Sequence, residues 1–244
     1  MENLLLVGLS QQMAMRRHMD IIANNIANMN TAAYKSQSVL FEEYLMRMPA
    51  ADAASRKMSF VEDVATIRNL QEGRFETTGN PLDIAIEGKG YFTVETPDGP
   101  RYTRDGHFSA DANGKIINND GYALLSADGG TFTVDNTERD ISIAKDGSLS
   151  TNRGLKGKIG LVTFANEGDM NNIGSSLYET KQKPEPSTKS ELIQGAIEQS
   201  NVQPVVEMTK MMELVQAYKS INDLMDRADD LQRRTIQQAA GGQA

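Results

Sequence analysis

The chain has 244 residues, a net charge of -8 at pH 7 and no cysteine. Because phosphate binding needs a concentrated basic face, this acidic balance argues against a nucleic-acid-binding surface, and the lack of cysteine excludes disulfides, thiolate catalysis and cysteine metal sites. No apolar run approaches the roughly 20 residues that a membrane span needs, and the start, MENLLLVGLS, has no Lys or Arg before its apolar run, so it is a poor secretory signal.

Residue types are distributed unevenly along the chain. Twelve of the thirteen methionines lie in residues 1–58 or 208–225, and six of the seven phenylalanines lie between Phe60 and Phe164. Methionine fills irregular gaps between helices, whereas phenylalanine favours the pleated surface of a sheet. The composition therefore predicts an α+β fold with helical ends and a β-rich middle.

The first predicted element is a helix from Glu2 to about Met29, roughly 40 Å long at 1.5 Å per residue. It belongs to an N-terminal segment over 1–35. Alternating steps of three and four residues define a heptad seam, which packs against a partner helix. The seam residues are Leu5, Gly8, Gln12, Met15, Met19, Ile22, Ile26 and Met29.

Three asparagines, Asn24, Asn25 and Asn28, lie near the end of this helix. Asparagine is a mediocre helix former. The cluster indicates either a fraying C-terminus with asparagine caps or amides that hydrogen-bond neighbouring backbone and fix register. The apolar stripe continues through Ile26 to Met29, and this favours the second interpretation.

A linker or extended segment is expected over 36–75. Lys35 to Arg47 is predicted to be a short helical or extended piece. Pro49 to Ser59 is small, polar and without periodicity, which is typical of a flexible linker. Phe60 to Glu76 alternates weakly, as in an extended segment that reaches a central domain.

A central β domain is predicted over 76–190. Six turn dipeptides punctuate it, and such pairs supply the positive φ values of tight hairpin turns. They are Asp98-Gly99, Asp105-Gly106, Asn113-Gly114, Asp120-Gly121, Asp128-Gly129 and Asp146-Gly147. The runs between them predict short strands at 91–94, 101–104, 115–117, 122–125, 132–134, 141–143 and 158–164. Strands of this length and spacing suggest a meander that closes into a small barrel or sandwich.

A C-terminal segment is predicted over 191–244, and its helix runs from Val202 to Gln238 without a glycine. Its seam follows the same three–four steps. The seam residues are Met211, Leu214, Tyr218, Ile221, Met225 and Ala228, and the stripe is widened by Met208, Met212 and Val215. The two ends of the chain therefore look like halves of one coiled-coil-like layer that carries the β domain as an insertion.

Residues that could perform chemistry do not form recognisable sites. His18 and His107 lie in different elements and neither has a second histidine at metal-ligand spacing. Gly88-Lys89-Gly90 does not complete a dinucleotide-binding motif, and the sequence after Asp111 fails as a calcium loop because Ile116 stands where glycine is required. The sequence predicts no enzyme, catalytic residue, cofactor or metal. The plentiful carboxylates leave a glycoside hydrolase pair as an alternative.

Several motifs resemble those of the bacterial flagellar axial proteins, which form the rod and hook. ANNIAN at 23–28, followed by Thr31, Tyr34 and Lys35, is similar to the family's N-terminal signature. TGNPLDIAIEGKGYF at 78–92 and YTRDGHF at 102–108 resemble the entry to its central β domain. SNV at 200–202, with Glu207 and Met208, resembles the start of its C-terminal helix. These motifs cover nearly the whole chain in the expected order.

Within this family the chain is more similar to a proximal-rod protein, and a distal-rod protein is the alternative. Ala33 stands where the family usually has glycine, and Tyr91 where it often has phenylalanine. The resemblance implies a structural subunit that leaves the cytoplasm through the flagellar export apparatus without a cleaved signal. It implies assembly in the periplasm with copies of itself and with proximal and distal rod proteins, and neither nucleic acid nor membrane insertion is expected.

The residues expected to form the assembly interface lie on the two terminal helices and at their inner ends. They are Leu5, Leu9, Met15, Met19, Ile22, Asn24, Asn25, Ile26, Asn28, Asn201, Val202, Met208, Met211, Leu214, Tyr218, Ile221 and Met225. Two alternatives from other classes remain. One is a chaperone with paired helices like prefoldin, and the other is a secreted hydrolase that acts through carboxylates of the β domain.

Overall fold

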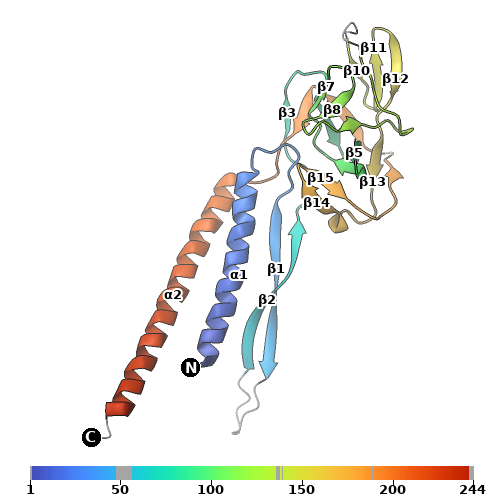
Figure 1. Cartoon of the computed structure of the whole chain (residues 1–244). Helices are drawn as coiled ribbons and strands as arrows, with labels where there is room; N and C mark the ends of the chain where they lie inside the picture. Colours follow the sequence, from blue (N-terminus) through green and yellow to red (C-terminus); the bar gives the residue numbers. More distant parts are fainter. Residues whose placement is uncertain (1, 48–56, 136–137, 139, 188, 242–244) are drawn as a thin grey trace. The chain divides into compact units, whose positions relative to one another are not determined.

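The computed structural model describes residues 2–47, 57–135, 138, 140–187 and 189–241. The fold is mixed α+β, with one helix at each end and a β-rich middle (Figure 1). The chain divides into two units. The first comprises Met1–Ala27, Gln37–Arg68 and Gln203–Ala244, and the second comprises Asn28–Ser36 and Asn69–Val202.

The first unit consists of two helices and a hairpin. Helix α1 (Glu2–Ala27) lies between helix α2 (Pro204–Gly241) and the hairpin of β1 (Gln37–Arg47) and β2 (Lys57–Arg68) (Figure 1). Helix α2 begins with a proline, whose missing N–H costs nothing in the first turn, and the acidic Glu207 lies close to the positive end of the helix dipole. Both helices were predicted within two or three residues of their observed bounds.

The hairpin is the main departure from the predicted linker. Gln37 pairs with Arg68 and Arg47 with Lys57, in an antiparallel ladder with one register shift after Leu40. The extended alternative for Lys35 to Arg47 is therefore confirmed, and the helical one is wrong. Of the linker predicted over Pro49 to Ser59, residues 49–56 lie outside the described part of the chain, whereas 57–59 belong to β2.

The second unit contains the remaining strands. They are β3 (Phe75–Thr77), β4 (Ile84–Glu87), β5 (Tyr91–Thr96), β6 (Gly99–Thr103), β7 (Phe108–Ala110), β8 (Ile116–Asn118), β9 (Ala123–Leu124), β10 (Ser142–Ile143), β11 (Ser148–Thr151), β12 (Gly154–Lys158), β13 (Leu161–Thr163), β14 (Asn171–Gly174), β15 (Leu177–Glu179), β16 (Glu185–Pro186), β17 (Glu191–Gln194) and β18 (Ala196–Glu198). A short 3-10 helix, η1 (Glu167–Asp169), precedes β14.

The largest sheet has the order β14-β15-β6-β5-β9-β8-β7, and β13 joins β5 to β16 beside it. Among the described residues this sheet does not close, so the barrel alternative was wrong. The physical reason lies in the topology, because β8 and β9 turn back from β7 toward β5 and leave the outer edge of β7 without a strand. Three smaller sheets are β10-β11-β12, β17-β4 and β18-β3.

Two sequence predictions need correction in this unit. Of the strand predicted at 132–134, only Thr133 pairs, through an isolated bridge to Lys115. The segment predicted over 191–244 does not belong wholly to the helical ends of the chain, because it begins with β17 and β18, which pair with β4 and β3 in the second unit. Strands from the start of this unit's sequence, β3 and β4, are thus paired with strands from its end, β18 and β17.

The core of the second unit is formed by apolar residues from most of its strands. The rings of Phe92 and Phe108 meet edge to face at 5.2 Å, close to the favoured geometry of an aromatic pair. A smaller aromatic cluster lies beside it. It consists of Tyr91, Tyr102, Phe164, Met170 and Tyr178. Burial raises the pKa of Tyr91, whose hydroxyl lies 3.1 Å from Glu167 Oε2.

The turn prediction is confirmed at five of the six glycines. Gly99, Gly114, Gly121, Gly129 and Gly147 have φ between 78° and 107°. The sixth glycine differs. A Cβ atom on Gly106 would lie 1.6 Å from the carbonyl oxygen of Ile84, so this glycine is required by the close approach of another strand rather than by a left-handed turn.

Candidate assembly interface

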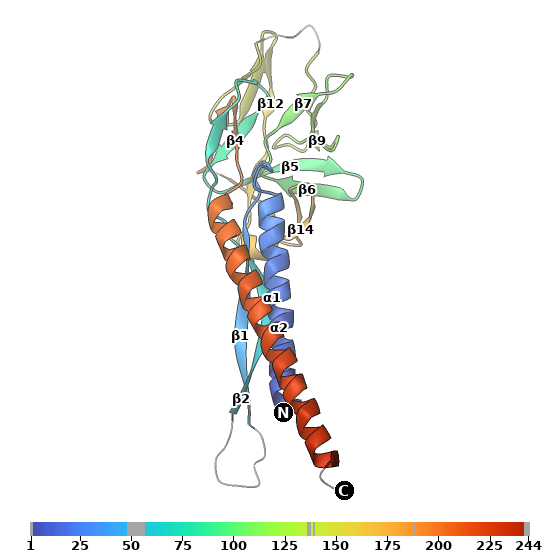
Figure 2. The same ribbon diagram turned by 90° about the vertical axis from the view of Figure 1, so that its left-hand side faces the viewer.

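Helices α1 and α2 run antiparallel and lie side by side (Figure 2). A Cβ atom on Gly8 would lie 3.0 Å from Met225 Sδ, so glycine allows the helices to approach there. Gln12 Nε2 donates a hydrogen bond to Asn222 Oδ1 near the same level. The structure therefore brings the two terminal helices together, with Gly8 and Met225 of the predicted seams beside each other.

The seam residues are only partly covered within one chain. Ile22 is 2% exposed, but most of the other predicted seam residues are only half-buried. They are Met15, Met19, Ile26, Met211, Leu214, Tyr218, Ile221 and Met225. A two-helix contact cannot enclose so wide a stripe. The unit therefore retains apolar surface that further packing would remove from water.

Asn25 is the polar anchor of this unit. Its side chain is 2% exposed, Oδ1 accepts from Gln37 N at 2.9 Å, and Nδ2 donates to Gln37 O at 2.8 Å. The same Nδ2 donates to Glu207 Oε2 at 3.1 Å. One amide therefore links α1, the start of β1 and the first turn of α2. The bonds to Gln37 agree with the interpretation in which an amide of this cluster hydrogen-bonds neighbouring backbone.

The other two asparagines behave differently. Asn24 is exposed on α1. Asn28 follows the last helical residue, and Thr31 donates to its carbonyl oxygen and to its Oδ1, both at 3.2 Å, so Asn28 begins the turn after the helix. Their spacing in the sequence does not show which of the three faces the interior.

Leu9 and Met208 are 50% and 45% exposed, so they lie outside the α1–α2 seam. Other exposed apolar residues lie near them. They are Leu6, Met13, Val205, Met212 and Val215. None of these was among the residues expected to form the assembly interface, although Met212 and Val215 were expected to widen the apolar stripe of the second helix. The side chain of Leu5 lies outside the described part of the chain.

At the entry to α2, Asn201 and Val202 join separate segments of the second unit. Asn201 Oδ1 accepts from Ser36 N at 2.7 Å, and its Nδ2 donates to the carbonyl oxygens of Asn69 and Gln71 at 2.9 and 2.8 Å. Val202 is 8% exposed. These contacts tie the segment after α1, the segment after β2 and the segment before α2 to one another.

A buried charge cluster that sequence analysis missed lies beside Asn201. Glu198 is 1% exposed, and its carboxylate contacts Lys35 Nζ at 2.6 Å and Arg104 Nε at 2.9 Å. It also accepts from Gly73 N at 2.9 Å. Burial lowers the pKa of Lys35, and the adjacent Glu198 carboxylate opposes this shift. A lone acid in a short strand gives no signal in the sequence, because alternation does not reveal which charges will be paired.

Ala33 lies in the same region, where the family resemblance leads us to expect glycine. Its φ is 55°, its side chain is 1% exposed, and its N–H donates to Glu198 O at 2.8 Å. This is the left-handed region that glycine adopts without strain. Alanine therefore closes the same turn at a cost of roughly 1–2 kcal/mol in backbone strain.

Several polar groups of the β domain are paired locally. The described residues contain no group of three or more His, Asp or Glu side chains that could hold a metal ion. His107 Nδ1 lies 2.9 Å from Asp83 Oδ1 at the isolated bridge between these residues. The Asp83 carboxylate also accepts from Thr78 Oγ1 at 2.6 Å and from Asn80 Nδ2 at 2.9 Å, so it holds together the turn over residues 78–83.

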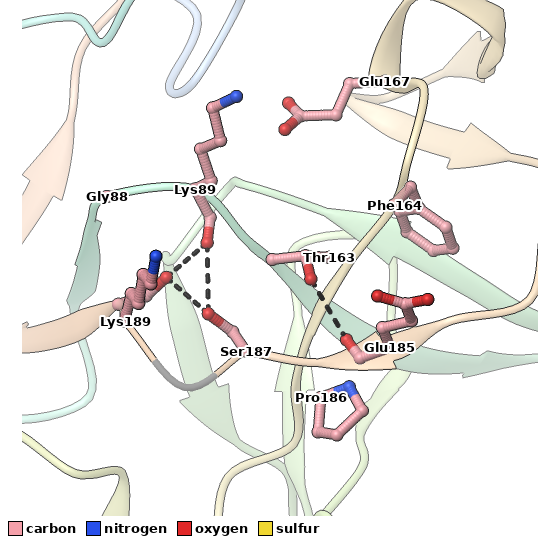
Figure 3. Close-up of a pocket in the computed structure, with 10 residues that line it drawn as sticks. Gly88, Lys89, Thr163, Phe164, Glu167, Glu185, Pro186, Ser187 and Lys189 are labelled. Carbon is pink, nitrogen blue, oxygen red and sulfur yellow. Dashed lines mark hydrogen bonds between the residues drawn. The ribbon is translucent and has the colours of Figure 1, made fainter.

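The groove in Figure 3 has a volume of about 410 Å³. Ser187 and Ser190 both donate to the carbonyl oxygen of Lys89, and Thr163 Oγ1 donates to the carbonyl oxygen of Glu185. The polar groups along this groove thus satisfy the backbone of the groove itself.

Three family models match the chain in consecutive regions. Residues 5–35 match the flagella basal body rod protein model, residues 85–151 match the flagellar hook protein FlgE/F/G D1 domain, and residues 193–238 match the C-terminal region of the flagellar basal body rod FlgEFG proteins. A flagellar basal-body rod protein FlgF from Caulobacter vibrioides is 38% identical, with 97% of this chain and 98% of the relative covered. The chain belongs to the flagellar rod and hook family.

Other rod and hook family members are similar over most of their length. FlgF from Mesorhizobium japonicum is 35% identical over 92% of each chain. FlgG from Bacillus subtilis is 31% identical, with 94% of this chain and 96% of the relative covered. The predicted family and its proximal-rod type are confirmed by these matches. Within the described residues, no helix has the length and apolarity required to cross a membrane.

Proposed function

We propose that this chain is a structural subunit of the bacterial flagellar basal-body rod, of the proximal type. The observation that carries this proposal is the near full-length similarity to proteins named FlgF. Similarity to FlgG is also extensive but lower in identity for the relatives compared above. The three matching family models all describe flagellar rod or hook proteins, and they give no support to a prefoldin-like chaperone or to a hydrolase.

The chain polymerises through its paired terminal helices into a hollow drive shaft. The antiparallel α1–α2 pair supports this mechanism, because its half-buried seam and its exposed outer residues leave apolar surface for neighbours. Burying such surface releases roughly 25 cal/mol per Å². Coiled-coil-like packing of these helices, with the β domain as an insertion, would propagate heterologous contacts along a filament.

The partners in this proposal are copies of the chain and other proximal and distal rod proteins. The chain would leave the cytoplasm through the flagellar export apparatus without a cleaved signal and reach its place in the periplasmic part of the basal body. Neither nucleic acid nor insertion into a membrane has a role in it. The terminal helices would gain most of their stability on docking, because isolated helices gain little without tertiary packing.

The test replaces one seam residue with a charge in the full chain. Ile26→Asp puts a carboxylate into the half-buried seam, where an unpaired charge costs several kcal/mol. We expect cells to lose motility and isolated basal bodies to lack the variant. The β domain should keep its near-ultraviolet circular dichroism. Asp20→Glu, on the exposed face of α1, is the matched control and should remain motile.

Normal motility of cells that carry Ile26→Asp, with full incorporation of the variant into basal bodies, would refute the proposed role of the seam in assembly. Absence of the unaltered chain from isolated basal bodies would overturn the rod assignment itself. Hydrogen exchange of the purified monomer provides an independent measurement. Strong protection across both α1 and α2 before assembly would show that docking does not order the helices.

A further inference from the structure

Each helix of the first unit carries a second apolar stripe outside the seam. On α2 this outer stripe consists of Val205, Met208, Met212 and Val215, and on α1 it consists of Leu6, Leu9 and Met13. All seven residues are at least 38% exposed. In both stripes the steps are three and four residues, so the members of each stripe share one side of their helix. Each stripe lies roughly 130° around its helix from the seam, at 3.6 residues per turn.

The two outer stripes lie at different levels along the helix pair. Gly8 lies beside Met225, Gln12 bonds to Asn222, and Asn25 bonds to Glu207. The residue numbers in each of these pairs add up to between 232 and 234, which fixes the antiparallel register. Met208 is therefore level with about residue 25 of α1, which places it about 24 Å along the axis from Leu9 at 1.5 Å per residue.

We propose that the outer α2 stripe of one copy packs against the outer α1 stripe of a second copy of this chain. This inference rests on the proposed rod function and specifies its contact. Both stripes are aliphatic and methionine-rich, and they cover similar lengths of helix, residues 205–215 and 6–13. The docked helices would be antiparallel, as α1 and α2 already are within one copy. All copies would therefore point in the same direction.

The axial separation of the stripes determines the kind of assembly. Docking them moves each copy by about 20 Å along the helix axis relative to its neighbour, since the centres of the stripes are about 14 residues apart in level. Each copy then keeps its other stripe free for the next copy. Such a heterologous contact gives an open helical array, whereas contact of a stripe with itself would close a dimer and stop growth.

Disulfide cross-linking tests this contact directly, because the chain contains no cysteine. The test variant is Met208→Cys with Leu9→Cys in the full chain, oxidised in cells and followed in isolated basal bodies. A disulfide requires Cα atoms within about 7 Å, so residues about 24 Å apart in one copy cannot be linked to each other. We expect linked species of two or more copies, and a linked pair when chains with only one of the two cysteines are mixed.

Two control variants make the result decisive. Gly8→Cys with Met225→Cys lies across the seam of one copy and should form an internal disulfide. Gln11→Cys with Glu213→Cys is equally exposed, but on sides of the helices that face away from the outer stripes, and it should form no link. Together these controls separate specific docking from unspecific oxidation.

Several results would overturn the proposal. One is that both double variants are present in basal bodies, and the Gly8→Cys, Met225→Cys control forms its internal disulfide, but the Met208→Cys, Leu9→Cys variant forms no link between copies. Another is a dimer from Met208→Cys alone, which would show an α2-to-α2 contact. Equal linking of the Gln11 and Glu213 variant would also contradict it. A chain that is absent from basal bodies would instead refute the proposed function, so the two failures are distinguishable.

Discussion

The cluster around Glu198 should be the most sensitive point in the second unit. Glu198, Lys35 and Arg104 are 1%, 4% and 4% exposed, and a second carboxylate, that of the 36% exposed Glu72, lies 3.4 Å from Arg104. Glu198→Gln preserves the shape of the side chain but removes the negative charge that both cations contact. Breaking a buried ion pair by removing one partner costs about 3–5 kcal/mol. We expect a loss of this size in the free energy of unfolding.

The assay is urea unfolding followed by near-ultraviolet circular dichroism, which reports on the aromatic cluster in the same unit. The cluster consists of Tyr91, Tyr102, Phe164, Met170 and Tyr178. The matched control is Glu191→Gln, which removes the partner of Lys145 in a pair whose side chains are 55% and 80% exposed. Exposed pairs contribute about 0–1 kcal/mol, so the control should lose little.

The pH dependence gives a second measure of the same cluster. Burial already lowers the pKa of Lys35 below its value in the unfolded chain, 10.5. Between the folded and unfolded pKa values the folded state binds fewer protons, so stability rises with pH in that window. Glu198→Gln removes the charge that opposes the shift and widens the window downward. Its loss of stability should therefore shrink as the pH rises from about 7 toward 10.

A loss below about 1 kcal/mol in Glu198→Gln, or a loss equal to that of Glu191→Gln, would refute the reasoning. It would show that the two cations find other acceptors. Arg104 already donates to the carbonyl oxygens of Ile86 and Gly88, at 3.3 and 3.0 Å. These two bonds are neutral, and the carboxylate of Glu72 lies farther from Arg104, at 3.4 Å, than that of Glu198, so the proposed cost concerns the missing charge of Glu198.

Two further substitutions test local packing. Gly106→Ala should lower the free energy of unfolding by about 3 kcal/mol or more, because its Cβ would overlap the Ile84 carbonyl. Gly99→Ala has open space around it and should lose only about 1 kcal/mol, for its positive φ. Similar losses for the two variants in thermal unfolding would contradict this explanation. Asn25→Ala should cost about 1–3 kcal/mol and speed hydrogen exchange at the Gln37 amide, which loses its acceptor. Exchange as slow as in an Asn24→Ala control would show that another group holds that amide.

Much of this protein is determined by local sequence. The three–four spacing of Leu, Ile and Met predicts both terminal helices and the apolar side of each, because helical periodicity is a property of neighbouring residues. Five of the six turn glycines have the positive φ that their dipeptides indicate. The motifs at 23–28, 78–92 and 102–108 identify the family without any knowledge of the fold.

The tertiary structure decided what depends on residues far apart in the chain. The pairing of β1 with β2, the strands β17 and β18 beside β4 and β3, and the open edge of the large sheet follow from long-range contacts. The same is true of single residues. Glu198 becomes an ion-pair centre, and Gly106 a point of close approach, only because Lys35, Arg104 and Ile84 are brought to them by the fold. Periodicity shows which side of an element is apolar, but only packing decides which charge is buried and which apolar side remains exposed.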